Sequence, residues 1–132
     1  MSDFPLSDAC PCQSGLCYGD CCFLLHRKMR SAPTAEALMR SRYSAFVLLN
    51  ADYLLYSWHP STAPTTLEFD RDLTWNGLSI THTSGGGPFD AVGSVTFMAY
   101  YECAGVKNTL TEKSHFSRWE KRWVYESGIV TG

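Results

Sequence analysis

Four cysteines near the start of the chain have the residue type and the spacing of a metal site. Cys10 and Cys12 are separated by one residue, and Cys21 and Cys22 follow as an adjacent pair after eight more. Four thiolates can complete a tetrahedral shell around zinc, and such closed shells stabilise structure. A disulfide fits less well, because adjacent cysteines pair only in a strained geometry. The spacing predicts a zinc site, with redox-active thiols or another metal as the alternatives.

Three other side chains bear on the ligand set. His26 lies four residues after Cys22, and its imidazole could replace one thiolate. Cys17 falls outside the spacing, so we expect it to take no part in metal binding. Cys103 stands alone near the end of an expected strand and is expected to be an ordinary buried or half-buried residue.

A second candidate site is a carboxylate on the inward face of an expected strand. Over residues 107–118 the odd-numbered positions are polar, so the even-numbered face is predicted to point inward. This face carries Glu112 and Ser114 between apolar residues. An inward carboxylate is costly unless it is paired, and Arg42, on the apolar face of an expected helix, is the partner that we expect.

The same carboxylate has an alternative, catalytic role. In an apolar pocket, burial can raise the pKa of Glu112 so that it acts as a general base, and His59 could share that role. The simpler interpretation is an ion pair between Arg42 and Glu112 that fixes the helix on the sheet. The sequence contains no nucleophile motif and no phosphate-binding glycine loop, which favours a protein that is not an enzyme.

The elements that must hold these side chains are marked by caps and breaks. Thr34 can cap a helix over residues 35–49, and Asn50 can cap a shorter helix over residues 51–58. After a loop, we expect strands over residues 77–83, 91–102, 107–118 and 121–126, with Gly93 as a candidate β-bulge. Two helices followed by an antiparallel meander predict an α+β domain with the helices on one face of the sheet.

Length and composition limit the possible functions. The chain has 132 residues and a formal net charge of −2, so it has the size of one ordinary domain and no general attraction to nucleic acid or acidic membranes. Its start resembles no secretory signal, and its apolar runs are too short to span a membrane. These features predict a cytoplasmic protein, in which clustered cysteines indicate a metal more often than a disulfide.

Two resemblances cover nearly the whole chain. Residues 10–22 resemble the SEC-C zinc motif, through CPCQSG at residues 10–15, Tyr18 and the pair of cysteines. The remainder resembles the YchJ-like family of small bacterial proteins. The similarity lies in APTAEALMRSRYSA at residues 32–45, DYLL at 52–55, WHPST at 58–62, Glu112, Ser114, Phe116, Arg122 and Trp123. Two departures are Gln13, where the family usually has glycine, and Ala63, where an arginine commonly stands.

These resemblances imply a fold and a domain organisation. A zinc knuckle is expected over residues 1–30, and a cone-like domain of two helices on a curved antiparallel sheet, of the nuclear-transport-factor-two-like or cystatin-like kind, over residues 31–132. Such cones often enclose a pocket. The side chains expected to line it are Arg42, Tyr43, Trp58, His59, Glu112, Ser114 and Trp123.

Three functions follow from these features. The leading hypothesis is a zinc-binding adaptor whose knuckle recruits a protein partner, because the SEC-C motif of the preprotein translocase motor helps to bind an export chaperone. The alternative is a small-molecule-binding or enzymatic cone with a pocket around Glu112. A weaker hypothesis is an RNA- or ribosome-associated module, suggested by Arg27, Lys28 and Arg30 beside the knuckle. The oligomeric state is left open.

Overall fold

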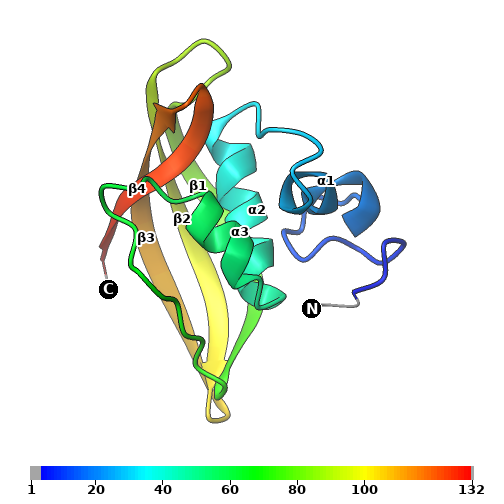
Figure 1. Cartoon of the computed structure of the whole chain (residues 1–132). Coiled ribbons are helices and arrows are strands. Elements are labelled where there is room, and N and C mark those ends of the chain that lie inside the picture. Colours follow the sequence, from blue (N-terminus) through cyan, green and yellow to red (C-terminus); the bar gives the residue numbers. More distant parts are fainter. Residues whose placement is uncertain (1–3, 132) are drawn as a thin grey trace.

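Three α-helices and a four-stranded sheet follow one another in residues 4–131, the part of the chain that the computed structural model describes (Figure 1). The elements are the 3₁₀ helix η1 (Tyr18–Asp20), helices α1 (Cys22–His26), α2 (Ala35–Val47) and α3 (Ala51–Tyr56), and strands β1 (Leu73–Gly85), β2 (Val92–Cys103), β3 (Val106–Trp119) and β4 (Arg122–Val130). The strands form an antiparallel meander in the order β1-β2-β3-β4. Helices α2 and α3 lie on one face of this sheet, and the cysteine segment lies beyond α2 (Figure 1).

The predicted α+β architecture is therefore confirmed. The predicted knuckle and cone domains begin and end in residues 1–3 and 132, which lie outside the described residues. One helix was not predicted, because α1 has only five residues and lies inside the cysteine segment. Among residues 4–131, no helix combines the length and the apolar character needed to cross a membrane.

The two predicted helix caps are confirmed. The side chain of Thr34 accepts a hydrogen bond from the backbone N–H of Ala37 (3.1 Å), and that of Asn50 accepts one from Tyr53 (3.1 Å). Each helix ends two residues earlier than predicted. Leu49 adopts a left-handed φ of 57°, which stops α2 and reverses the chain toward α3.

Strands β1, β3 and β4 are longer than predicted, and the irregularities of the sheet lie elsewhere. β1 begins four residues before the predicted start, and β4 continues four residues beyond the predicted end. The prediction of a bulge at Gly93 is wrong, because this residue pairs in regular register with both neighbouring strands. A glycine is needed there for close approach, since a Cβ would collide with the backbone of Gly86. The register shifts instead within β1 and between His115 and Phe116 on β3.

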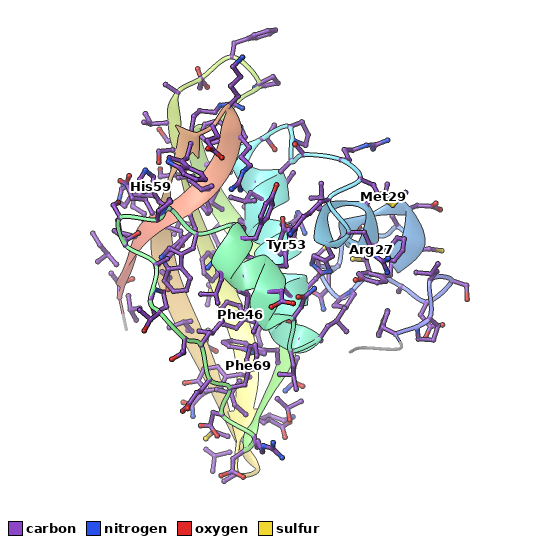
Figure 2. All side chains as sticks on the ribbon, in the orientation of Figure 1. Arg27, Met29, Phe46, Tyr53, His59 and Phe69 are labelled. Carbon is purple, nitrogen blue, oxygen red and sulfur yellow. The ribbon has the colours of Figure 1, made fainter. Side chains whose placement is uncertain are left out.

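The core fills the space between α2, α3 and the sheet (Figure 2). Its most buried members from the two layers include Leu38, Ala45 and Leu54 from the helices and Val95 and Phe116 from the strands. The loop before β1 also contributes: Phe69 packs edge-on against Phe46 of α2, with ring centroids 6.3 Å apart (Figure 2). The curved sheet and the helices thus form the cone-like arrangement that positions the cavity described below.

Candidate functional site

The four predicted ligands lie together. The Sγ atoms of Cys10, Cys12, Cys21 and Cys22 all lie within 4.8 Å of one another. The Sγ of Cys21 lies 3.6 Å from that of Cys12 and 3.9 Å from that of Cys22. Four sulfurs that each bind one zinc ion at about 2.3 Å form a tetrahedron with edges of about 3.8 Å. The donor set and its spacing therefore fit a tetrahedral metal ion.

Tight turns bring the two cysteine pairs together. An isolated antiparallel bridge joins Ala9 to Cys17, so the loop between the pairs folds back on itself. The backbone N–H of Gln13 donates to the carbonyl of Cys10 (3.0 Å), and Gln13 has a left-handed φ of 63°. Glycine adopts this conformation more readily than glutamine does. Helix α1 then begins at Cys22 and fixes the second pair.

The thiols share their protons unequally because they are crowded in a buried space. Hydrogen bonds from Cys12 and Cys22 lower the pKa of Cys10. The bond with Cys10 raises the pKa of Cys12 to about 11, and it also raises the pKa of Cys22. A first thiolate therefore opposes the ionisation of the others. A bound divalent cation would remove this penalty, because metal ligation requires thiolates.

The structure does not place His26 in the ligand set. This buried imidazole accepts a hydrogen bond from the Tyr18 hydroxyl at Nδ1 (2.7 Å) and donates from Nε2 to the carbonyl of Ser41 (2.8 Å). A carbonyl can only accept, so the ring is the neutral Nε2–H tautomer. Burial lowers the pKa of His26, which favours this neutral form. His26 instead joins α1 to α2.

The two remaining cysteines stand apart from the cluster. Cys17 is exposed, and Cys103 is half-buried at the end of β2. Neither belongs to the group of side chains that could share a metal among the described residues.

The cysteine segment is docked firmly on α2. The Cys10 Sγ lies 3.6 Å from the Ser44 hydroxyl, and Arg40 donates from Nη1 to the carbonyl of Cys12 (2.8 Å). The side chain of Gln13 also reaches the sheet, where its Oε1 accepts from the backbone N–H of Leu78 (3.1 Å). The cysteine cluster is thus coupled to the helix that also carries four residues of the second site, Met39, Arg42, Tyr43 and Phe46.

The second site is a cavity of about 190 Å³ between α2 and the sheet, here called the cone cavity. Its walls are mostly aromatic and aliphatic, with few polar groups. The lining residues are Met39, Arg42, Tyr43, Phe46, Trp58, Trp75, Phe97, Ala99, Leu110, Glu112, Ser114, Phe116 and Tyr125. The predicted inward face of β3 is confirmed, because all four of its even-numbered residues from Leu110 to Phe116 line this cavity.

The predicted ion pair between Arg42 and Glu112 is wrong. Within residues 4–131 the one ion pair joins Arg40 to Glu36. Arg42 instead donates from Nη1 to the carbonyl of Leu54 (2.8 Å) and to the hydroxyl of Ser57 (2.7 Å). The C-terminal end of α3 offers these acceptors, and a cation is favourable at such an end.

Aromatic rings complete the surroundings of Arg42. Its guanidinium carbon lies 5.0 Å from the centroid of Trp58 and 4.6 Å from that of Tyr125. Burial lowers the pKa of Arg42 to about 10, opposed by Coulombic attraction to Tyr125, Tyr53 and Glu112. Because this value is far above neutral pH, the cavity contains a permanent buried cation.

Neighbouring residues of the sheet accommodate the carboxylate of Glu112. The Ser114 hydroxyl donates to Oε2 of Glu112 (2.7 Å). A Cβ at Gly128 on β4 would collide with this carboxylate, so the glycine makes room for it. Burial raises the pKa of Tyr125, and the negative charge of Glu112 adds to that effect.

Two predicted lining residues lie elsewhere. His59 does not line the cone cavity: its Nδ1 accepts from the backbone N–H (3.1 Å) and hydroxyl (2.8 Å) of Ser61. Trp123 is a fully buried residue of β4 outside the cavity lining. The prediction that these two side chains share a pocket with Glu112 is therefore wrong.

The most informative residue of the cavity is one whose polar atom lacks a partner. Trp58 lines the cavity, and its indole Nε1–H is buried without a hydrogen-bond acceptor among the described residues. Tyr125, which the sequence analysis missed, holds this indole edge-on at 5.3 Å between centroids. A parallel bridge between Trp58 and Tyr125 brings them together. No local pattern marks such a bridge between a post-helical residue and a strand.

The basic residues beside the cluster are partly engaged. The guanidinium of Arg27 lies 5.7 Å from the ring centroid of Phe23, and the ammonium of Lys28 lies 4.3 Å from that of Tyr56. Figure 2 shows Arg27 and Met29 on the outer side of the cysteine segment. These contacts place two of the cations beside aromatic rings of the protein itself.

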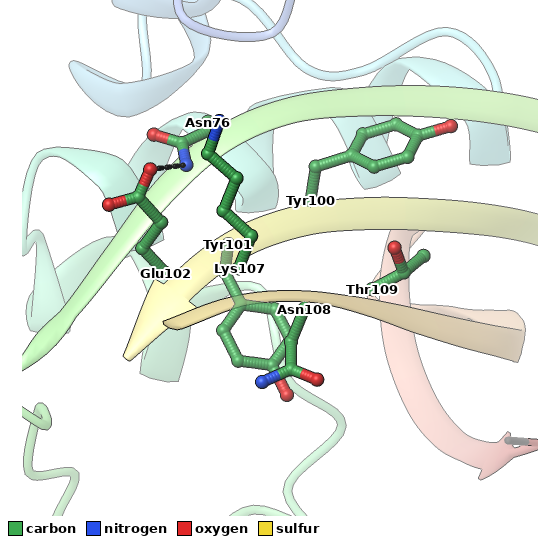
Figure 3. A pocket seen from close by; sticks show the side chains of 7 residues that line it. All are labelled: Asn76, Tyr100, Tyr101, Glu102, Lys107, Asn108 and Thr109. Atoms are coloured by element: carbon green, nitrogen blue, oxygen red, sulfur yellow. Dashed lines mark hydrogen bonds between the residues drawn. The ribbon is translucent and has the colours of Figure 1, made fainter. Parts of the chain in front are cut away.

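A shallow hollow of about 390 Å³ lies on the sheet near the turn between β2 and β3 (Figure 3). Asn76 donates to the Glu102 carboxylate across it (3.4 Å), and Lys107 stands opposite Glu102 on β3. Its charges are thus balanced within the hollow. Neither of the two buried polar side-chain atoms that lack a partner among the described residues belongs to its lining, so it is a weaker candidate than the cone cavity.

Known proteins are similar to this chain over most of its length. The family model described as the middle NTF2-like domain of YchJ matches residues 34–128. A UPF0225 protein of Corynebacterium glutamicum is 46% identical over 123 residues, which cover 92% of this chain and 96% of that protein. A UPF0225 protein of Streptomyces coelicolor is 46% identical over 119 residues, which cover 90% and 93%.

Solved structures are similar over both parts of the chain. The solution structure of a SEC-C motif containing protein from Rhodopseudomonas palustris has a TM-score of 0.80 and 31% identity, and the match covers 93% of this chain and 98% of that one. The crystal structure of a SEC-C motif containing protein from Psychrobacter arcticus has a TM-score of 0.77 and 26% identity, with coverage of 96% and 85%. Two other proteins that contain a SEC-C motif therefore have a similar fold over most of this chain.

Proposed function

We propose that this chain, which belongs to the YchJ-like family UPF0225, is a cytoplasmic, zinc-stabilised protein that binds a small molecule in its cone cavity. It joins a SEC-C motif to an NTF2-like domain. Four thiolates at tetrahedral spacing favour zinc, which has no redox chemistry and forms closed thiolate sites. Free cysteines at all six positions fit a reducing compartment.

The unpartnered indole N–H of Trp58 carries the small-molecule proposal. A buried donor without an acceptor costs about 1–3 kcal/mol, and a ligand that supplies the acceptor recovers this free energy. The aromatic walls favour a flat apolar body, and the buried cation of Arg42 favours an acceptor or anionic group near the indole. The ligand class is thus a one- or two-ring aromatic molecule that carries a hydrogen-bond acceptor.

A substitution that fills the cone cavity tests whether a ligand binds there. Ala99 lines the cavity and is 1% exposed, so Ala99→Phe should place a ring where the ligand lies. We expect the affinity for a bound aromatic compound to fall by about tenfold or more. The probes are one- and two-ring compounds with a carboxylate, amide or ring-nitrogen acceptor. The readout is the NMR shift of the Trp58 indole N–H.

Thr96→Phe is the matched control for this test. It adds the same ring to the same strand at a half-buried position outside the cavity lining. This variant should bind like the wild type. If no probe binds at millimolar concentration, or if Ala99→Phe binds as well as Thr96→Phe does, the cavity is not a ligand site.

A second candidate function is that of an adaptor whose knuckle docks a protein partner. Its support is the exposure of three apolar side chains on the cysteine segment: Leu6 is 50% exposed, Leu16 is 53% exposed and Met29 is 69% exposed. Contiguous exposed apolar patches are typical of docking surfaces, so this proposal requires these side chains to act as one patch. The SEC-C motif of the preprotein translocase motor, which helps to bind an export chaperone, is a precedent for such docking.

The adaptor function predicts a surface-dependent interaction. A Leu16→Asp, Met29→Asp double variant should lose a partner that the wild type retains in a pull-down from bacterial lysate. Val106→Asp, on an apolar side chain that is 61% exposed at the β2–β3 turn, should retain it. Equal recovery of every captured protein by the double variant would exclude this surface as the docking site.

A further inference from the structure

A second, smaller space lies where the cysteine segment meets the cone. It is a crevice of about 30 Å³ between α1, α3 and β4. The residues that follow α1 form one wall, and residues of α3 and β4 form the other. Its lining residues are Leu25, Lys28, Arg30, Ser31, Ala32, Leu38, Tyr53, Tyr56, Ser57, Arg122 and Trp123. None of them lines the cone cavity.

All charged side chains in this crevice are cations. Lys28 and Arg30 come from the segment after α1, and Arg122 comes from the start of β4. No aspartate or glutamate belongs to the lining. The ammonium of Lys28 and the guanidinium of Arg122 lie 4.3 and 3.9 Å from the same Tyr56 ring centroid. Arg122 also donates from Nη1 to the carbonyl of Tyr56 (2.9 Å), so Tyr56 positions two of the three cations at the crevice.

One residue of the crevice lining contains a buried donor without a partner among the described residues. Trp123 is 1% exposed, and its Nε1–H has no hydrogen-bond acceptor among the described residues. Trp123 belongs to the crevice lining. A buried indole N–H is normally hydrogen-bonded, because leaving it unpaired costs about 1–3 kcal/mol. The orphan donor is an observation independent of the three cations, and both call for the same kind of ligand.

We propose that this crevice binds a phosphate group, with Lys28, Arg30 and Arg122 around its oxygens and the indole N–H of Trp123 as a buried donor. A volume of about 30 Å³ has room for about two water molecules, so it admits phosphate oxygens but no organic ring. Three cations suit a dianion better than a carboxylate, and arginine is the side chain best adapted to phosphate. Any organic part of the ligand would extend into solvent.

The site bridges two parts of the chain. Lys28 and Arg30 follow the last cysteine ligand closely, whereas Arg122 and Trp123 belong to the sheet. A bound phosphate would therefore hold the metal-bearing segment against the cone. This proposal does not depend on the small-molecule function of the cone cavity, because the two sites share no residue.

The test uses the zinc-loaded full chain with uniform nitrogen-15 labelling. Inorganic phosphate is added at constant ionic strength, balanced with chloride. We expect a saturable shift of the Trp123 indole N–H resonance, which is assigned by its loss in Trp123→Phe. The Trp58 indole resonance should stay in place. Backbone amides of residues 28–32 should titrate with the same midpoint.

Two variants measure separately how the Arg30 charge and the Trp123 indole N–H contribute to phosphate affinity. Arg30 is exposed, so Arg30→Gln should not affect folding, and it should weaken phosphate binding by about fivefold. Trp123→Phe keeps an aromatic ring in the core and should weaken binding by about tenfold, followed through the backbone amides. Lys113→Gln removes an exposed cation on β3 that does not line the crevice and should leave the affinity unchanged.

Three further ligands identify the source of the phosphate group. Tighter binding of glycerol 3-phosphate than of inorganic phosphate would indicate a small phosphorylated molecule, and equal binding would indicate the free anion. Acetate should bind more weakly than either. Equal shifts with acetate or chloride, no saturation, or full affinity in both Arg30→Gln and Trp123→Phe would each overturn the proposal.

Discussion

Replacing Cys22 by serine is expected to remove the metal from the protein and to unfold the cysteine segment. Cys22 is 2% exposed, supplies one of four clustered sulfurs and begins α1. Structural zinc contributes about 10–16 kcal/mol to the folding of small zinc-binding peptides, so residues 4–30 should not stay folded without it. We expect the metal content to fall from about one ion per chain to almost none, measured by mass spectrometry of the intact protein and by elemental analysis.

The effect should extend into α2 but not through the whole cone. Arg40, Ser41 and Ser44 of α2 contact the cysteine segment through hydrogen bonds or a sulfur contact. Hydrogen exchange should therefore lose protection over residues 4–30 and on this face of α2, while β2 and β3 remain protected. Cys17→Ser, which alters an exposed thiol outside the cluster, should keep its metal and its protection. Global unfolding of Cys22→Ser would contradict this division.

The second large effect is expected at Arg42. Arg42→Ala removes two hydrogen bonds to the end of α3 and a cation that contacts two aromatic rings. It also leaves buried acceptors without a donor. We expect the free energy of unfolding to fall by about 3–5 kcal/mol, measured by urea denaturation.

Two further variants show which property of Arg42 matters. Arg42→Met keeps most of the volume, so the difference between Met and Ala isolates packing from hydrogen bonding. Arg71→Ala, at an exposed position in the loop before β1, should change the free energy of unfolding by less than about 0.5 kcal/mol. A loss below about 1 kcal/mol for Arg42→Ala would show that Arg42 is not what holds α3 in place.

Local signals were sufficient for the main elements of the fold. Thr34 and Asn50 determine helix starts through hydrogen bonds that span only three residues, so the sequence alone reveals them. The alternation along β3 likewise predicts which of its faces is inward. The ends of β1 and β4 are different, because they depend on pairing with distant strands. Glycine at position 93 could signal a bulge or a close approach, and only the packed neighbour at Gly86 decides.

The residues of the candidate sites could likewise be predicted only where their signal is local in the sequence. The cysteine spacing predicts the metal cluster because all four ligands lie within thirteen residues of one another. The partner of Arg42 was mispredicted, because the end of α3 supplies acceptors whose position depends on how two helices cross. From the sequence, both Trp58 and His59 are expected to line the cavity. The backbone bridge to Tyr125 turns one of these side chains toward the cavity and leaves the other outside it.

Gln13 has a consequence for how the protein behaves at high concentration. Strand β1 is an edge strand of thirteen residues, and such edges invite pairing with strands of other molecules. The Gln13 side chain occupies the N–H of Leu78 on this strand, and the cysteine segment covers one side of α2. A fragment that begins at residue 31 would expose both surfaces and would tend to self-associate. We therefore expect the cysteine segment to reduce self-association of the cone, because it occupies part of this edge and of α2.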